Sequence, residues 1–297
     1  MPVSEPSSAS WRLIAAKIEH VIAAPFRITH RRPVAGGCIN GASLVEGNGL
    51  RLFVKFNVAQ QLSMFDAEAD ALTRLAAAAA IRVPEPLCTG IAGNHAFLAL
   101  EYLALGDGAQ DWARMGREFA AQHRVCNDRF GWHRDNTLGS TPQANGWMPR
   151  WIDFLRERRL GYQLGLAAEK GFGGRLQSLG AGLLVRLDRF FDDYSPQPSL
   201  LHGDLWSGNA GFLSDGQPVV FDPACYFGDR EADLAMTELF GGFPAEFYRA
   251  YETAAPLHPG YRQRKRIYQL YHLLNHLNLF GAGYLRRCES TLEALSA

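Results

Sequence analysis

Three side chains that could carry chemistry lie about two thirds of the way along the chain. Asp204 is followed five residues later by Asn209, and Asp222 ends a short apolar run at 219–221. Residues 214–217 form a good turn sequence, so we expect a hairpin that returns Asp222 towards Asn209. Carboxylate and amide oxygens are the ligands that hard cations prefer. The pattern therefore indicates a cation site accompanied by a further carboxylate, Asp204.

The spacing from Asp204 to Asn209 matches the D-L-x-x-x-N pattern of the protein-kinase catalytic loop. In that loop the Asp accepts the proton of the attacking hydroxyl, while the Asn and a later Asp hold Mg²⁺ on the ATP phosphates. The alternative is that Asp204 and Asp222 are turn and cap residues on a solvated loop. An acid, an Asn and a second acid after a hairpin together favour phosphoryl transfer.

A glycine-rich turn in the first part of the chain suits the same chemistry. Gly36, Gly37, Cys38 and Asn40 lie between two expected strands, where backbone N–H groups can approach phosphates. The turn is neither a Walker A motif nor the kinase G-x-G-x-x-G. Taken alone it is a weak signal, because most glycine-rich hairpins are only hairpins.

A lysine and a glutamate strengthen this interpretation. Lys55 follows two bulky apolar residues at the end of the next strand, as in the kinase V-A-I-K pattern. Glu68 lies thirteen residues later on the apolar side of an expected helix, where an unpaired carboxylate would be costly. We predict a Lys55–Glu68 ion pair that directs the ammonium group at ATP phosphates. Two unrelated surface charges are the alternative.

Acidic residues also gather at the start of a helix expected over 231–240. Asp229 and Glu231 suit a capping role and the helix dipole. Asp233 faces the same way as apolar residues of that helix. We expect it to accept hydrogen bonds from backbone N–H groups of the catalytic loop.

Other classes of chemistry find little support. His272 and His276 are spaced i, i+4, but Leu273 stands where a zinc protease has Glu, so we interpret them as packing residues. No G-x-S-x-G motif is present. Thirty basic and thirty acidic residues cancel, so no global field attracts nucleic acid or membrane. Five scattered cysteines without a C-x-x-C pair fit a reducing cytosol. We expect a cytoplasmic monomer or weak homodimer.

The expected elements divide the chain into two lobes at 104/105. Helices at 11–23 (with Ser10 as N-cap) and 64–80 and five strands form the first lobe, and mostly helical segments form the second. The strands are expected near 26–34, 41–45, 50–57, 87–91 and 95–102, and the later helices at 111–126, 147–170, 176–194, 231–240, 245–252 and 261–279. This order predicts an α+β fold with a small β-rich lobe and a larger helical lobe. A ligand cleft between the lobes is expected.

The motifs together resemble the aminoglycoside-phosphotransferase and choline-kinase branch of the protein-kinase-like fold, which has His-Gly-Asp where protein kinases have His-Arg-Asp. Within it the chain resembles the fructosamine kinase family from about residue 11 to residue 285. The resemblance is carried by G-G-C-I-N at 36–40, F-G-W at 130–132, Q-A-N-G-W at 143–147, H-G-D-L-W-S-G-N at 202–209, D-P-A at 222–224, G-D-R-E at 228–231 and M-T-E-L-F-G-G-F at 236–243.

This resemblance implies an ATP- and Mg²⁺-dependent kinase of ketosamines, the adducts of glucose or ribose with amines. It implies phosphorylation of a sugar hydroxyl, commonly O3, after which the product releases the amine, a deglycation or protein-repair activity. The resemblance makes Asp204 the base, Asn209 and Asp222 the Mg²⁺ ligands and Lys55, paired with Glu68, the phosphate-binding lysine. The adenine hinge that it implies consists of Glu101, Tyr102 and Leu103. The side chains that it implies face the substrate are Trp206 and His202.

Two other functions are weighed against this one. A kinase of aminoglycosides or choline is disfavoured by Trp206 and by the G-D-R-E block. A non-catalytic nucleotide-binding protein is disfavoured because every catalytic residue named above is present. Asp222 is followed by Pro-Ala rather than Phe-Gly, so an activation switch of the protein-kinase type is not implied. Cys38 in the phosphate loop suggests redox control.

Overall fold

The computed structural model describes residues 4–34, 39–106 and 108–296. The chain forms two compact units, which we call the first unit (1–110 with 211–222) and the second unit (111–210 with 223–297). These units differ from the two lobes expected at 104/105 because the hairpin of β9 (Ala210–Phe212) and β10 (Pro218–Val220) groups with the first unit. The backbone N–H of Val220 donates to the carbonyl of Arg82 at 3.0 Å, which ties the hairpin to that unit.

The first unit is built on a five-stranded sheet in which every neighbouring pair is antiparallel. Its strand order is β1-β2-β3-β5-β4. The strands are β1 (His30–Pro33), β2 (Gly41–Gly47), β3 (Leu50–Val58), β4 (Pro86–Ala92) and β5 (His95–Glu101). Asn48 and Gly49 join β2 to β3 with positive φ angles of 49° and 80°, as a tight hairpin turn requires.

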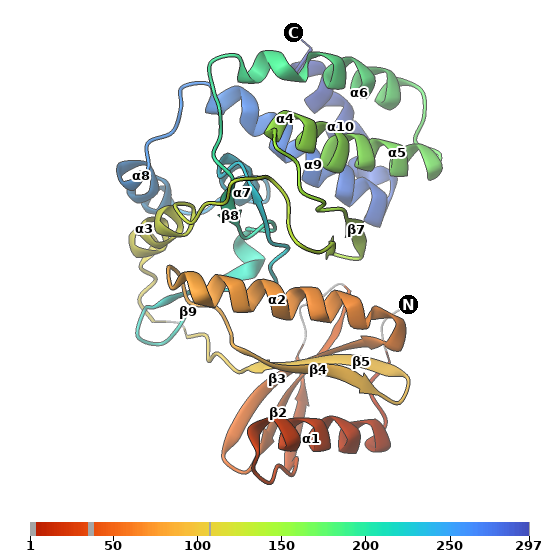
Figure 1. The fold of residues 1–297 in the computed structure, drawn as a ribbon, viewed down its shortest axis with the longest axis vertical. Coiled ribbons are helices and arrows are strands. Elements are labelled where there is room, and N and C mark those ends of the chain that lie inside the picture. Colours follow the sequence, from red (N-terminus) through yellow and green to blue (C-terminus); the bar gives the residue numbers. More distant parts are fainter. Residues whose placement is uncertain (1–3, 35–38, 107, 297) are drawn as a thin grey trace. The chain divides into compact units, whose positions relative to one another are not determined.

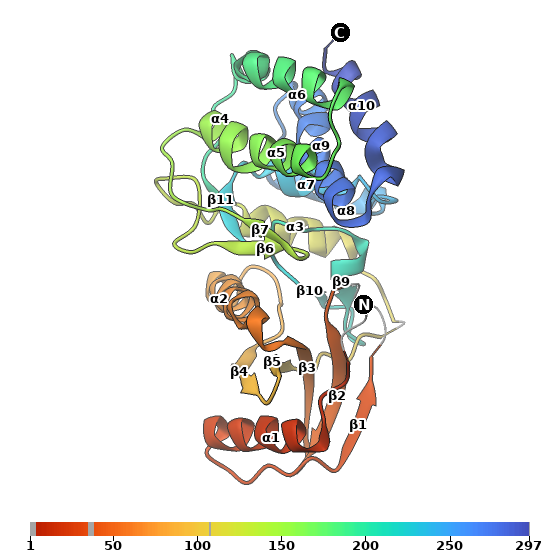
Figure 2. The ribbon, with the colours of Figure 1, turned by 90° about the vertical axis from the view of Figure 1, so that its right-hand side faces the viewer.

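Two helices cover opposite faces of this sheet, α1 (Ser8–Ile22) and α2 (Leu62–Ala78) (Figures 1 and 2). Side chains alternate between the faces along β3, so Leu52, Val54 and Phe56 pack into the core shared with α1. Lys55 therefore points to the α2 face. The helix expected at 11–23 begins three residues earlier, because Ser7 rather than Ser10 accepts the capping hydrogen bond.

The second unit is mainly helical, and α9 (Tyr261–Phe280) runs through it with α5, α7 and α10 packed against it (Figure 1). Two short antiparallel strand pairs, β6 with β7 and β8 with β11, complete it. The helices are α3 (Trp112–Gln122), α4 (Trp151–Phe154), α5 (Tyr162–Glu169), α6 (Arg175–Arg186), α7 (Glu231–Thr237), α8 (Ala245–Ala254) and α10 (Leu285–Ala294); the strands are β6 (Asn136–Leu138), β7 (Thr141–Gln143), β8 (Ser199–Leu201) and β11 (Tyr226–Gly228).

Some of these elements differ from those expected. The single helix expected at 147–170 is interrupted by a π-helical turn at Leu155–Gly161. A Cβ at Gly161 would lie 2.6 Å from the carbonyl oxygen of Arg156, so glycine allows the wider turn. The helix expected at 231–240 ends at Thr237, and α10 was not expected. Within the described ranges, no helix combines the length and the apolar character that crossing a bilayer would take.

The two histidines of α9 behave as the packing residues expected from the sequence. His272 is 4% exposed, and Nδ1 of half-buried His276 lies 2.9 Å from the carbonyl of His272. Burial lowers the pKa of His272 to about 3. Among the described residues no group of three or more His, Cys, Asp or Glu side chains is placed to hold a metal ion.

His272 makes the stability of the protein sensitive to acid. Its folded pKa of about 3 lies below the ordinary value of 6.5, so below pH 6.5 the unfolded chain binds a proton that the folded chain excludes. Stability is therefore lost as the pH falls through this window. Between pH 7 and pH 5 we expect the free energy of unfolding to fall by about 2 kcal/mol more in the wild type than in His272→Gln. Urea titrations at both pH values measure this; His30→Gln on exposed β1 is the control and should keep the wild-type slope.

Candidate active site

Lys55 lies between two carboxylates of the first unit. Its Nζ is 2.7 Å from Oε1 of Glu68 and 2.7 Å from Oδ1 of Asp222. The Lys55 side chain is only 7% exposed. The Lys55–Glu68 ion pair predicted from the sequence is confirmed, and it results from β3 directing Lys55 at α2, which carries Glu68.

The charges of this cluster stabilise one another. Burial works against the charge on Lys55, but Asp222 and Glu68 more than offset it and raise the pKa of the ammonium group. Burial raises the pKa of Glu68, whereas Lys55 acts in the opposite direction. The ammonium group is therefore fully charged at neutral pH, which is what binding a phosphate group requires.

Asp222 was expected near Mg²⁺ but not beside Lys55. It follows β10 with a positive φ of 58°, a conformation that Asp tolerates better than most residues. Only Oδ1 contacts Lys55, and the side chain is 46% exposed. The carboxylate can therefore hold the lysine with one oxygen while it presents the other to a ligand.

Asn40 is the one residue of the expected phosphate-binding turn that the structure describes. Asn40 precedes β2, and its Oδ1 accepts a hydrogen bond of 2.7 Å from Nδ2 of Asn57. Gly36, Gly37 and Cys38 lie outside the described residues, so their expected roles stay predictions.

The segment expected to form the adenine hinge begins where β5 ends. The carboxylate of Glu101 pairs with Arg82 and accepts the N–H of Glu85 at 3.2 Å. Tyr102 and Leu103 follow, half-buried and outside the strand, so strand pairing does not use their backbone groups. The Glu101 carboxylate thus already has partners within the protein. The hinge role expected of this segment is one for its backbone N–H and C=O groups.

In the second unit a buried carboxylate holds the catalytic-loop segment. Asp233 of α7 is 1% exposed. Its Oδ2 accepts the N–H of His202 at 2.7 Å, and its Oδ1 accepts the N–H of Gly203 at 2.8 Å. The predicted role of Asp233 is confirmed. Burial alone would raise its pKa, but His123 and the Gly203 N–H outweigh burial and lower it.

The expectation that His202 faces a substrate is wrong. His202 is fully buried, and its Nδ1 accepts the backbone N–H of Asp204 at 3.3 Å. Its ring therefore supports the loop from inside. Sequence reasoning missed this because the position next to Gly203 does not reveal which way a ring points.

Asp204 and Asn209 lie together, as their spacing predicted. Nδ2 of Asn209 donates to the backbone carbonyl of Asp204 at 2.8 Å and to its carboxylate Oδ2 at 3.1 Å. Asn209 is buried in the short 3₁₀ turn Ser207–Asn209. The amide nitrogen thus fixes the carboxylate, and the amide oxygen remains for a cation.

Trp206 lies across this turn. A Cβ at Gly208 would lie 2.3 Å from the Trp206 ring, so the indole covers the position where a side chain would stand. Its ring makes an edge contact with Phe240 at a centroid distance of 6.3 Å. Trp206 is nevertheless 36% exposed, as a substrate-facing residue would be.

Asp229 and Glu231 support the start of α7, but Glu231 does so through an ion pair rather than through the capping role expected of it. Oδ1 of Asp229 accepts the N–H of Glu231 at 3.0 Å at the start of α7 and the hydroxyl of Tyr194 at 2.9 Å. Glu231 is buried and makes two hydrogen bonds, of 2.8 and 3.0 Å, with Arg264 of α9. These contacts fix the helix that carries Asp233.

Side-chain amides fix the segment that follows Asp222 in the chain. Nδ2 of Asn136 donates to the carbonyl of Cys225 at 2.9 Å, and Nε2 of Gln143 donates to the carbonyl of Ala224 at 3.2 Å. Asn145 donates to Oδ1 of Asn136 at 2.8 Å. We call Asn136, Gln143 and Asn145 the amide clamp. Its members come from the β6–β7 region, which sequence analysis did not recognise as part of the site.

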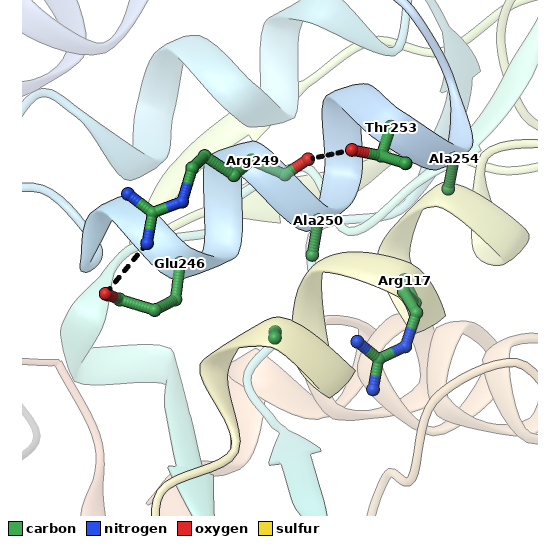
Figure 3. Close-up of a pocket in the computed structure, with 7 residues that line it drawn as sticks. Arg117, Glu246, Arg249, Ala250, Thr253 and Ala254 are labelled. Carbon is green, nitrogen blue, oxygen red and sulfur yellow. Dashed lines mark hydrogen bonds and ion pairs between the residues drawn. The ribbon is translucent and has the colours of Figure 1, made fainter.

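A hollow between α3 and α8 of the second unit contains none of the candidate site residues (Figure 3). Arg249 pairs there with Glu246 at 3.0 Å, and much of the remaining lining is alanine. The lining residues are Ala113, Arg117, Glu246, Arg249, Ala250, Thr253 and Ala254.

The fold is that of the protein-kinase-like phosphotransferases. It is similar to a crystal structure of an aminoglycoside phosphotransferase mutant in complex with AMP-PNP and hygromycin B, with a TM-score of 0.66 over 95% of this chain and 97% of that chain. The identity is 16%, so this likeness concerns the fold alone.

The family is defined by closer relatives. A family model described as fructosamine kinase matches residues 10–297, and the chain belongs to that family. A Synechocystis protein named "Probable ketoamine kinase" is 50% identical, covering 99% of this chain and 98% of its own. A solved Haemophilus somnus structure, provisionally assigned as a fructosamine-3-kinase, has a TM-score of 0.89 and 33% identity over 97% of this chain and 98% of that chain.

Gly203 of the catalytic loop has no room for a side chain. Its φ is +82°, and a Cβ there would lie 2.1 Å from the carbonyl oxygen of Ala224. We expect Gly203→Ala to lower the free energy of unfolding by roughly 2 to 4 kcal/mol, from strain and overlap together. Urea denaturation followed by fluorescence measures this.

Gly165→Ala is the matched control, because Gly165 lies in α5 of the same unit with nothing within 4 Å of its Cβ position. It should be stabilising by about 0.5 to 1 kcal/mol. Equal effects of the two substitutions would contradict the strained conformation described for Gly203.

Proposed function

We propose that this protein is an ATP-dependent kinase that phosphorylates a sugar hydroxyl of ketosamines, at O3. The observation that carries the proposal is a complete set of phosphoryl-transfer side chains in a member of the fructosamine kinase family: Lys55 paired with Glu68, and Asp204 held by Asn209. The Synechocystis relative is named as a ketoamine kinase, and the Haemophilus somnus structure is assigned to position 3. Both names support a ketosamine acceptor, and the name of the Haemophilus somnus structure also supports phosphorylation at position 3.

In this proposal the first unit binds the nucleotide. Lys55 is fully charged, buried and oriented by Glu68, so its ammonium group can neutralise phosphate oxygens with little loss of side-chain freedom. Asn40 and the glycine-rich residues 36–38 would donate backbone N–H groups to phosphates. The backbone at 101–103 would receive the adenine.

The residues proposed as Mg²⁺ ligands offer the donors that this ion prefers. Asp222 uses one carboxylate oxygen for Lys55 and exposes much of its side chain, and Asn209 uses its amide nitrogen for Asp204. Each therefore has an oxygen that the contacts described above do not use. When bound, Mg²⁺ would neutralise charge on the phosphates. Lys55 would then exchange its contact with Asp222 for one with the phosphates, while its ion pair with Glu68 stays formed.

Asp204 is proposed as the base that accepts the proton of the sugar hydroxyl. Asn209 fixes its carboxylate through Oδ2, and Asp233 fixes the preceding backbone. The carboxylate is thereby held in one orientation before substrate binds, which is what general-base catalysis by a positioned group needs. Trp206 would face the sugar.

The proposal also includes a cytosolic location and a monomeric or weakly dimeric state. Cys88, Cys126 and Cys288 are free thiols in the structure, as a reducing compartment allows. The competing functions are an aminoglycoside or choline kinase and a protein without catalysis. Membership of the fructosamine kinase family disfavours the first, and the intact set of side chains disfavours the second.

Asp204→Asn tests the base. Asn keeps the shape and the contact with Asn209 but cannot accept the proton, so we expect kcat to fall by roughly 10² to 10⁴ while the KM for ATP changes little. Asp193→Asn, at a side chain 79% exposed elsewhere in the second unit, is the control and should keep wild-type turnover. Near-normal turnover of Asp204→Asn would refute the assignment.

The acceptor is tested by turnover of MgATP against fructosamines, ribulosamines, the free sugars, choline and an aminoglycoside. We expect phosphorylation of the ketosamines and little of the others, and loss of turnover when EDTA removes Mg²⁺. NMR of the product locates the phosphate, which we expect on O3. Faster turnover of an aminoglycoside or of choline than of any ketosamine would replace the proposed function.

A further inference from the structure

A row of aromatic rings leads away from the catalytic loop across the second unit. Trp206 contacts Phe240 at a centroid distance of 6.3 Å, and Phe240 contacts His276 at 4.7 Å. His276 in turn contacts Phe280 at 5.4 Å and Tyr284 at 5.1 Å. We call these five residues the aromatic shelf. It begins two residues after Asp204.

Local structure fixes the distal end of the shelf. His276 and Phe280 are spaced i, i+4 on α9, so they share one face of the helix. α9 then ends at Gly281, whose φ of 88° turns the chain into the short 3₁₀ turn Ala282–Tyr284. This reversal brings Tyr284 back against His276. The three rings are therefore held in place without a ligand.

The shelf is open to solvent at both ends. Trp206 is 36% exposed and Phe280 is 52% exposed, while Phe240, His276 and Tyr284 between them are half-buried. Single exposed apolar side chains are common, but exposed rings that belong to one continuous cluster mark binding surfaces more often. This cluster also continues directly from the candidate active site.

The charge on the shelf limits what it can bind. Burial lowers the pKa of His276, and the nearby Arg287 acts in the same direction, so the imidazole is neutral at neutral pH. The Arg287 guanidinium stands 5.8 Å from the centre of the Phe240 ring. The shelf therefore offers uncharged ring surface bordered by a cation, which suits a flat apolar group better than a second positive charge.

The chemistry of the acceptor brings such a group to this place. In a ketosamine the nitrogen is bound to C1, four bonds from O3, so the two atoms lie within about 5 Å of each other. If Asp204 accepts the proton from O3, the amine-derived part must leave the site past the neighbours of Asp204. Trp206 and the shelf are such neighbours, and they present ring faces and edges.

We propose that the aromatic shelf binds the amine-derived part of the ketosamine and selects acceptors in which that part carries a flat apolar or aromatic group. The inference rests on the proposed function. Trp206 would contact the sugar, and the distal rings Phe280 and Tyr284 would contact the substituent on nitrogen. The shelf would thus determine which ketosamines bind, while Asp204 and Asn209 would have the same catalytic roles for every acceptor.

The test compares N-benzyl and N-methyl adducts of the same ketose as acceptors for the full-length protein. Both are secondary amines on one sugar, and they differ by the phenyl ring. We expect the wild type to have a lower KM for the benzyl adduct. Phe280→Ala and Tyr284→Ala should each raise that KM roughly 3- to 10-fold, the usual worth of one aromatic contact. Phe280→Tyr, which keeps an aromatic ring at this position, should have a KM for the benzyl adduct close to that of the wild type.

The KM for the methyl adduct, the KM for ATP and kcat should stay near wild type in all three variants, because neither ring belongs to the catalytic set. Val185→Ala, at a side chain 82% exposed on α6, is the control and should change nothing. If the ratio of the KM values for the benzyl and methyl adducts is unchanged in Phe280→Ala and Tyr284→Ala while turnover is intact, the proposed role of the shelf is wrong. The proposed kinase function would stand in that case. Failure of the wild type to phosphorylate either adduct overturns the proposed function, and the shelf with it.

Discussion

A carboxylate removed from water has to be paired or hydrogen-bonded, and each unit of this protein builds its part of the site on that constraint. In the first unit Glu68 is buried and can be charged only because Lys55 reaches it across from β3. In the second unit Asp233 is buried and accepts the N–H groups of His202 and Gly203. The carboxylates gain their partners, and the lysine and the catalytic loop gain one fixed position.

Much of this arrangement could be predicted from the sequence because it depends on short-range periodicity. The alternation along β3 placed Lys55 away from the core shared with α1, and the helical spacing of α2 put Glu68 on its buried side. The same reasoning assigned Asp233 to the backbone of the catalytic loop, and the five-residue spacing brought Asp204 and Asn209 together. Local patterns fix which face a side chain occupies.

The rest depends on contacts that no local pattern encodes. Asp222 pairs with Lys55 across 167 residues of sequence, so only the folded hairpin reveals the second carboxylate. His202 looked like a substrate contact because it adjoins Gly203 and Asp204, yet it is buried. The amide clamp comes from β6–β7, whose three-residue strands are too short for periodicity to identify. The fold class and the loop were therefore predictable, while the supporting contacts were not.

The amide clamp has a consequence for control. In protein kinases the segment after the metal-binding Asp is ordered or disordered by phosphorylation, and that transition regulates the enzyme. Here Asn136 and Gln143 hold the carbonyls of Cys225 and Ala224 through side chains that need no modification to form their bonds. Ordering of this segment therefore does not depend on a phosphate group, unlike the activation segment of a protein kinase.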